Sequence, residues 1–330
     1  MLEMTRGDWP KHDWTLPYTI KHQANRYGDR VFCSFHDGET LTFAGFDSET
    51  DALASGLVQL GVGPGDRVLM LGYNSKAFLL TWIATQKCGA IFVPINTELK
   101  GAFLEHQFRN AEPKVVFVDA ELRPAFDTVS IADVPVQTTV VLGDSPALPG
   151  TNRVEFAAVA RTAARAEDIV PAATGDVCTI MYTSGTTGPS KGVLMPQGHF
   201  VLFGYNMARA FSMTPEDKMF ICMPFFHAMG LAIQIVGCLI AGTPAHVVRR
   251  FAATTWVDDI RASDASITFG LGVIPEFIFR QPPTENDRNH RLRAMVAVPV
   301  ADEWGPQFEE RFGVRLMQGY GMTECNIPAW

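Results

Sequence analysis

The sequence lacks the features that mark secreted, disulfide-stabilised and membrane-spanning proteins. None of its six cysteines stands in CxxC spacing, so neither a disulfide framework nor a zinc site is expected. Residues 1–13 contain no apolar segment of the kind found in secretory signals. The stretch over residues 228–242 is apolar all round, but it is shorter than the roughly 20 residues that cross a bilayer. We therefore expect a cytoplasmic protein with reduced cysteines and no transmembrane segment.

Basic charge and disorder-promoting residues are also scarce. The 330 residues carry a formal net charge of −8, and only 19% of them are charged. Because no large positive field is available to neutralise phosphates, a nucleic-acid partner is not expected. Hydrophobic residues make up 47% of the chain, which excludes disorder for its bulk. The length is sufficient for two cores of ordinary domain size.

Short apolar runs rich in β-branched residues alternate with helix-like segments along the chain. This alternation predicts an α/β fold with parallel sheets that are covered by helices on both faces. Residues 143–171 are rich in Ala, Pro and Gly and form the best internal boundary. We therefore expect one α/β subdomain over residues 1–170 and a second over residues 171–330.

Apolar periodicity and capping residues predict the individual elements. Asn74 or Ser75 is suited to cap a helix over residues 76–88, and Thr97 is suited to cap the next helix. Strands are expected at residues 67–71, 90–94, 115–118, 139–142, 179–183, 192–195, 218–222, 245–248, 267–269, 295–298 and 314–318, and further helices at 199–211, 228–241, 254–262, 272–280 and 303–312.

The segment most informative about chemistry is MYTSGTTGPSKGV, at residues 181–193. Glycines let backbone N–H groups approach an anion closely, hydroxyl groups add donors, and a lysine adds a mobile positive charge. A loop around a triphosphate needs these groups, although a Ser/Thr/Gly surface turn has the same composition. A Walker A loop is excluded, because Ser190 stands where its second glycine belongs and Gly192 replaces the hydroxyl residue after Lys191.

The sequence TSGTTGPSKG, at residues 183–192, is very similar to the TSGTTGxPKG signature of the adenylate-forming superfamily. This superfamily contains acyl- and aryl-CoA synthetases, luciferases and the adenylation domains of peptide synthetases. Two further segments resemble it in the right order: MPFFHAMG (residues 223–230) resembles P-[LM]-F-H-x-x-G, and QGYGMTE (residues 318–324) resembles Y-G-x-T-E. Residues 57–96 also read like the N-terminal part of such enzymes. Within the superfamily, the sequence is most similar to the crotonobetaine/carnitine-CoA ligase-like group.

The resemblance implies two parallel-rich sheets covered by helices, as in the N-terminal domain of acyl-CoA synthetases. Complete members continue past the third motif with a β-barrel subdomain and a mobile C-terminal domain that bears a catalytic lysine. We expect both parts to be absent here, so that the chain is an N-terminal portion with little activity of its own. The sequence also departs from the family at Val296–Pro299 (VAVP), where many members carry a Gly-Gly-Ala-Pro-like segment. The adenine or acyl edge is therefore expected to be shaped differently.

By resemblance, the three motifs assign residues to the nucleotide, a metal and the acid. Tyr320 can lay its ring on a flat base, Thr323 can donate to the α-phosphate, and the carboxylate of Glu324 can hold Mg²⁺, which prefers oxygen ligands. Thr183 is the second expected metal ligand. Catalytic roles are implied for Lys191, His227, Thr323 and Glu324; nucleotide binding for Thr183, Ser184, Gly185, Thr186, Thr187, Gly188, Lys191, Gly319, Tyr320, Gly321, Met322 and Thr323; and the substrate pocket for Phe226, His227, Met229, Phe269 and Val298.

The implied activity is that of an ATP-dependent acid–CoA ligase in fatty acid or carnitine metabolism. A carboxylic acid attacks the α-phosphorus of ATP, pyrophosphate departs, and the CoA thiol then takes the acyl group from the adenylate. The implied cofactors are ATP or AMP, Mg²⁺, and coenzyme A as a co-substrate, and a homodimer is one expected assembly. Two alternatives stay open: an adenylate-forming enzyme that loads a carrier protein, and a non-catalytic nucleotide-binding module.

Overall fold

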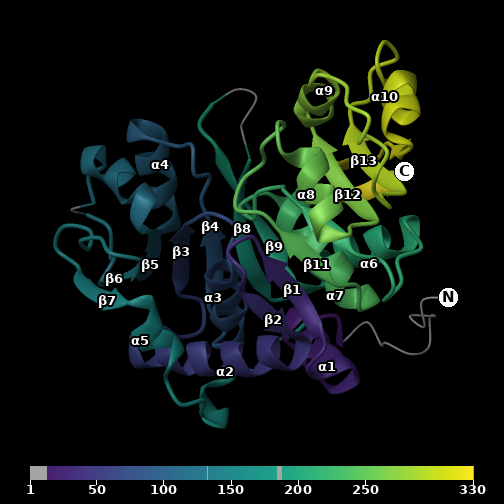
Figure 1. Ribbon diagram of the computed structural model, residues 1–330. Helices are drawn as coiled ribbons and strands as arrows, with labels where there is room; N and C mark the ends of the chain where they lie inside the picture. Colours follow the sequence, from purple (N-terminus) through teal and green to yellow (C-terminus); the bar gives the residue numbers. More distant parts are fainter. Residues whose placement is uncertain (1–12, 132, 184–187, 330) are drawn as a thin grey trace.

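Two seven-stranded sheets make up the protein in the computed structural model, which describes residues 13–131, 133–183 and 188–329 (Figure 1). The first sheet has the strand order β7 (Asn152–Glu155), β6 (Thr138–Leu142), β5 (Val115–Asp119), β3 (Arg67–Leu71), β4 (Ile91–Pro94), β8 (Val177–Thr183) and β9 (Lys191–Pro196). The second sheet has the order β14 (Arg315–Met317), β13 (Ala294–Val298), β12 (Ile267–Leu271), β10 (Met219–Ile221), β11 (Ala245–Val247), β1 (Val31–Phe35) and β2 (Thr40–Thr42). A separate hairpin joins β15 (Tyr320–Met322) to β16 (Asn326–Ala329).

The strands of both sheets run mostly parallel. The pairs β1–β2 and β8–β9 are antiparallel, and the other neighbouring strands of the two sheets pair in parallel. A strand of a parallel sheet is covered on both faces, which favours a continuous apolar run. β5, with the sequence VVFVD, is accordingly buried at every residue. The predicted α/β fold with two parallel-rich sheets is confirmed.

Helices cover the sheets, as Figure 1 shows for α2 and α3. The α-helices are α1 (Leu16–Tyr27), α2 (Phe43–Gln59), α3 (Lys76–Lys87), α4 (Gly101–Ala111), α5 (Phe156–Ala160), α6 (Gln197–Ala210), α7 (Val236–Ala241), α8 (Trp256–Ser263), α9 (Ile274–Phe279) and α10 (Gly305–Phe312). Two 3₁₀ segments, η2 (Ala120–Thr128) and η3 (Ala166–Asp168), and one π-helical segment, η4 (Met229–Ile235), complete the chain's helical elements within the described residues.

Most of the predicted strands and helices are confirmed to within a few residues. The helix expected over residues 228–241 begins as the π-helix η4 and continues as α7. Ser75 caps α3 by accepting a hydrogen bond from the N–H of Phe78 (3.2 Å). The prediction for Thr97 is wrong, because α4 begins at Gly101 with Lys100 as its N-cap residue.

The two sheets do not divide the chain at residue 170. β1 and β2, from the N-terminal part, pair within the second sheet through β11. β8 and β9, which follow residue 170, extend the first sheet from β4. Each sheet therefore uses strands from both sides of the predicted boundary, and the division of the chain into 1–170 and 171–330 stays a prediction.

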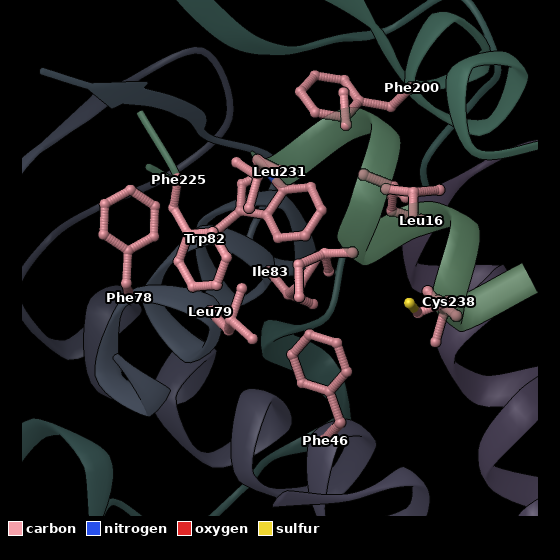
Figure 2. Packing of buried hydrophobic residues seen from close by; sticks show 14 of the residues in the cluster. Leu16, Phe46, Phe78, Leu79, Trp82, Ile83, Phe200, Phe225, Leu231 and Cys238 are labelled. Carbon is pink, nitrogen blue, oxygen red and sulfur yellow. The ribbon is translucent and has the colours of Figure 1, made fainter. Parts of the chain in front are cut away.

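A single apolar core connects the two sheets, and α3 lies within it. All residues of α3 from Phe78 to Lys87 are buried. In Figure 2, Phe78 and Trp82 of α3 lie close to Phe225 and Leu231, which belong to the segment that follows β10. Because this core includes residues of both sheets, it holds the sheets in a fixed relation.

The cysteines agree with the expected absence of disulfide bonds. All six are free; five are buried and Cys325 is exposed.

Among the described residues, no helix has the length and apolar character that a membrane crossing requires.

A buried lysine joins the C-terminal end of α3 to α2. The Nζ of Lys87 lies 2.7 Å from Asp47 Oδ1 and 2.6 Å from Asp51 Oδ1, and it also donates to the backbone carbonyl of Asp47. Its side chain is only 3% exposed. A buried ammonium group is stable only where carboxylates and carbonyls replace its lost hydration, so these contacts fix α3 against α2.

Replacing Lys87 with Ala should lower the free energy of unfolding by about 3 kcal/mol, because Asp47 and Asp51 would lose their shared cation. Lys76→Ala is a matched control on the same helix, since its ion pair with Glu49 is more exposed. Its loss should cost about 0.5 kcal/mol. Urea denaturation of both variants measures the difference, and equal losses would contradict the role assigned to Lys87.

Candidate active site

Two adjoining cavities lie at the carboxyl ends of the central strands, where ligands bind in open α/β sheets. The larger has a volume of about 690 Å³ and is reached from Pro94 at the end of β4 and Thr183 at the end of β8. The smaller has a volume of about 240 Å³ and borders the ends of β12 and β13. Four residues belong to both walls: His227, Ala228, Met322 and Thr323.

The larger cavity brings together residues of all three sequence motifs. Thr183 and Gly188 come from the first motif, His227 from the second, and Thr323 and Glu324 from the third. Ser184, Gly185, Thr186 and Thr187 lie outside the described residues. The other lining residues are Pro94, Asn96, Leu99, Phe103, Gln107, Met181, Tyr182, Pro189, Ser190, Phe226, Ala228 and Met322.

The β8–β9 hairpin that carries the first motif is anchored on α4. The backbone carbonyl of Ser190 lies 2.9 Å from His106 Nε2, and its hydroxyl oxygen accepts a hydrogen bond from Gln107 (3.0 Å). On the other strand, the hydroxyl of Tyr182 donates to Asn110 Oδ1 at 2.7 Å. Burial raises the pKa of Tyr182 to about 12, so this hydroxyl stays protonated and remains a donor at neutral pH. The two strands therefore have fixed positions on either side of the loop.

The two charged residues of the predicted catalytic set are available for a ligand. Lys191 is exposed and pairs in register with Thr183 across the hairpin, although it does not line either cavity. Glu324 is exposed in the larger cavity. Within the described part of the chain, neither side chain forms an ion pair with another residue. A charged ligand would therefore not have to displace an ion-pair partner among the described residues.

The β15–β16 hairpin carries the third motif and is held on α6. His199 Nε2 donates to the backbone carbonyl of Thr323 (2.8 Å). Asn206 donates to Asn326 Oδ1 (3.1 Å), and Asn326 Nδ2 in turn donates to the carbonyl of His199 (3.1 Å). These contacts fix the turn that contains Glu324. The position of the backbone in this turn therefore places Glu324 in the wall of the larger cavity.

His227 lies in a tight turn between the two cavities. Its backbone N–H donates to the carbonyl of Pro224 (3.1 Å), and its Nδ1 accepts a hydrogen bond from the N–H of Met229 (3.1 Å). His227 is partly exposed at the cavity walls, and burial of the rest of the ring lowers the pKa of His227. A neutral ring that accepts at Nδ1 carries its proton on Nε2, which can donate to a ligand.

The smaller cavity is lined mostly by apolar side chains. The predicted pocket residues His227, Met229, Phe269 and Val298 line it, whereas Phe226 lines the larger cavity. No Asp, Glu, Lys or Arg occurs among its lining residues in the described part of the chain. Its other lining residues are Phe203, Ala228, Ile233, Leu271, Val296, Gly319, Tyr320, Gly321, Met322, Thr323 and Ile327.

Sequence reasoning missed several residues that shape the site. Phe203 of α6 and Ile327 of β16 line the smaller cavity, and apolar residues outside a motif carry no local signal of such a role. Asn74, which the sequence offered as a helix cap, hydrogen-bonds instead to the segment that contains His227. The apolar periodicity of α6 could have indicated which face is buried, but not that this face borders a cavity.

The described residues contain no group of three or more His, Cys, Asp or Glu side chains that could hold a metal ion. The two predicted metal ligands, Thr183 and Glu324, both line the larger cavity. Their hydroxyl and carboxylate oxygens are the donor types that Mg²⁺ prefers, and Mg²⁺ commonly completes its coordination with water and substrate phosphates. The donor set therefore fits a magnesium ion that is bound together with a nucleotide.

The fold and the motif-lined cavities define a class of enzyme. The AMP-binding enzyme family matches residues 20–330, and the chain belongs to this family of adenylate-forming enzymes. The chain is 28% identical over 322 residues to the medium/long-chain-fatty-acid–CoA ligase FadD6 of Mycobacterium tuberculosis, which covers 96% of this chain and 52% of that protein. It is also 28% identical over 312 residues to the crotonobetaine/carnitine–CoA ligase of Salmonella typhi, covering 92% of this chain and 60% of that protein.

The chain thus spans between 52% and 60% of the length of these two curated relatives. Among solved structures, the anthranilate CoA ligase AuaEII in complex with anthranoyl-AMP matches with a TM-score of 0.87 and 21% sequence identity. That match covers 97% of this chain and 62% of the other. It shows that this chain has the fold of the N-terminal part of acyl-CoA synthetases.

The imidazole of His227 should titrate below the ordinary histidine pKa of 6.5, because packing of the turn disfavours its charged form. The ring would then be neutral at pH 7 and gain its proton only in more acidic solution. NMR titration of the ring Hε1 signal, assigned by its absence from His227→Ala, measures this pKa. A pKa at or above 6.5 would contradict the loss of hydration inferred for the ring.

Proposed function

We propose that the complete protein is an ATP-dependent acid–CoA ligase and that this chain supplies its nucleotide and acid sites. One observation carries the proposal: a larger cavity with motif-derived polar groups adjoins a smaller apolar cavity, and both share His227 and Thr323. In our proposal the phosphates lie in the larger cavity and the apolar acid in the smaller one, whose wall also includes Gly319, Tyr320 and Gly321, which the resemblance assigns to the nucleotide. Membership of the AMP-binding family and two relatives named CoA ligases support this assignment.

The first step requires positioning and charge neutralisation more than covalent chemistry. The acid's oxygen attacks the α-phosphorus, and the bond between that phosphorus and the departing pyrophosphate breaks. In our proposal Lys191 and the loop after Thr183 bind the outer phosphates, and Thr323 donates to the α-phosphate. His227 lines both cavities, and in our proposal its Nε2–H would orient the attacking carboxylate.

Magnesium is part of this proposal. Thr183 and Glu324, which both line the larger cavity, would hold the ion. When bound, the ion neutralises charge that develops on the phosphates.

In the second step, the CoA thiol attacks the acyl carbonyl and AMP departs. Loading of a carrier-protein thiol has the same chemistry, so the two activities differ in the thiol that is accepted. Formation of a thioester only when CoA is supplied would support the ligase, whereas acylation of a carrier protein would support the alternative.

Acid-dependent exchange of pyrophosphate into ATP, measured on the product of the complete gene, tests the adenylation step. Lys191→Ala and Glu324→Ala should each lower the exchange rate by about 10²–10³-fold, because the first removes a positive charge next to the phosphates and the second removes a ligand of the magnesium ion that neutralises them. Lys21→Ala is a matched control, since Lys21 is an exposed lysine on α1 outside both cavities. Exchange that is absent with every acid, or unaffected by both variants, would contradict the proposal.

We further propose that the smaller cavity takes an uncharged, apolar acyl group of limited size. A cavity of about 150 Å³ holds benzene. A volume of about 240 Å³ therefore suits one ring with a few further carbons, or a short to medium chain. The absence of charged side chains from its described lining disfavours a second carboxylate on the acid, because an unpaired buried charge is costly.

Ile233 of η4 should limit the length of the acid, because its buried side chain lines this cavity. Ile233→Ala should shift the preferred acid toward chains that are about two methylene groups longer. Each added methylene group should raise kcat/KM about fourfold, which corresponds to about 0.8 kcal/mol of burial.

Ile235→Ala is the matched control for this experiment, because Ile235 is buried in the same π-helix but does not line either cavity. A series of straight-chain acids in the exchange assay gives the chain-length profile of each variant. Identical profiles for the two variants would show that Ile233 does not limit the acid.

A further inference from the structure

Asn74 joins the two sheets through hydrogen bonds to their backbones. It follows β3 of the first sheet and is only 3% exposed. Its Nδ2 donates to the carbonyl of Met223 (3.0 Å) and to the carbonyl of Val248 (3.2 Å). Its Oδ1 accepts a hydrogen bond from the N–H of Phe225 (2.8 Å). Met223 and Val248 follow β10 and β11, so one amide contacts the ends of two strands of the second sheet.

The segment over residues 223–230 is compact. Holding one end of it at Asn74 therefore also fixes the residues of this segment that line the cavities. A Cβ atom on Gly230 would lie 2.5 Å from the carbonyl oxygen of Pro224, so the two ends of the turn touch directly. The N–H of Leu231 donates to the carbonyl of His227 (3.2 Å). On its inner side, the ring of Phe225 packs on Phe78 with 5.5 Å between ring centroids (Figure 2).

The residues that follow this anchor form the wall between the two cavities. The hydrogen bond from the N–H of Phe225 to Asn74 fixes the position of Phe225. His227 and Ala228, two and three residues later, line both cavities. We propose that Asn74 is a positioning residue that fixes this wall, and with it the imidazole of His227, relative to the first sheet and its phosphate-loop hairpin. The importance of the wall for catalysis rests on the proposed function, whereas its attachment to Asn74 does not.

The chemistry of the side chain explains why an amide stands here. Two backbone carbonyls need donors and one backbone N–H needs an acceptor, and an amide supplies both from a single planar group. Aspartate would supply the acceptor but lose the donors, and leucine would match the volume but offer neither. The buried backbone groups would then lack partners, and the turn would be free to move toward water.

Native-state hydrogen exchange of Asn74→Leu tests the attachment on the chain itself. The amide of Phe225 should exchange about tenfold faster or more than in the unaltered protein, because its acceptor is gone. Gln23→Leu is the matched control: Gln23 is also a buried amide, and it donates to the carbonyls of Leu239 (2.6 Å) and Ile240 (2.8 Å). Gln23→Leu should change the hydrogen-exchange rate of the Phe225 amide by no more than about twofold, when the two variants are compared at temperatures that give them equal free energies of unfolding.

The pKa of His227 is a second measurement, and it reports the position of the wall between the cavities and not merely the stability of the fold. If Asn74 holds the turn, its loss should increase hydration of His227, so the NMR-measured pKa of His227 should rise toward the ordinary value in Asn74→Leu but not in Gln23→Leu. Asn74→Ser, which leaves room for water at the freed backbone groups, provides the same comparison if the leucine variant does not fold. An unchanged Phe225 exchange rate and an unchanged His227 pKa in the folded Asn74 variant would overturn the proposal.

These measurements require neither ATP, acid nor CoA. A failure of pyrophosphate exchange would therefore contradict the proposed function and leave this inference standing. Normal pyrophosphate exchange, together with an unchanged Phe225 hydrogen-exchange rate and an unchanged His227 pKa in the Asn74 variants, would support the proposed function and contradict this inference.

Discussion

The burial of α3 on every side is the constraint on which the rest of the structure depends. One end of the helix packs on the first sheet, where Phe78 meets Phe92 edge-on with 5.5 Å between ring centroids. Further along, Trp82 meets Phe200 of α6 at 5.6 Å. A helix whose residues are buried on every face has no side to offer to water, so it must be enclosed by two layers. The core that results runs through both sheets, and the ends of their strands meet at one region of the surface.

The polar residues in that region divide into those that hold the backbone and those left for a ligand. Asn74, Ser190 and His199 each contact a backbone group or an anchoring side chain, and each places a loop that carries a motif. Lys191 and Glu324 form no such contacts with described side chains. Electrostatic catalysis requires charged groups that a rigid backbone already holds in place. The free-energy cost of ordering these groups is then met during folding and not during the reaction.

Local sequence predicted the elements and the motifs well, because both depend on short-range patterns. The strand over residues 67–71 and the helix over residues 76–88 appear almost as expected, and residues of the three motifs do meet at one cavity. Sheet membership could not be predicted, because β1 pairs with β11 across more than 200 residues of chain, and no local pattern records that partner.

The role of Asn74 was also beyond the sequence for the same reason. An asparagine before a helix has the local signature of a cap, but Ser75 already supplies the cap of α3. The amide of Asn74 can therefore donate hydrogen bonds to carbonyls that lie about 150 and 174 residues further along the chain. Cellular compartment and assembly stay predictions, since they depend on properties that neither the fold nor the cavities report.

The departure from the family at Val296–Pro299 affects the wall of the smaller cavity and leaves the sheet intact. Successive side chains of a strand point to opposite faces, so Val296 and Val298 of β13 face the smaller cavity while Met295 packs in the core beneath α8 and α10. β13 pairs with β12 and β14 through backbone groups, which do not depend on these side chains. Where many family members have glycine and alanine, two branched side chains project into the cavity. The same change that weakens the match to the motif therefore alters the wall of the smaller cavity, which takes the acid in our proposal, and leaves the fold unchanged.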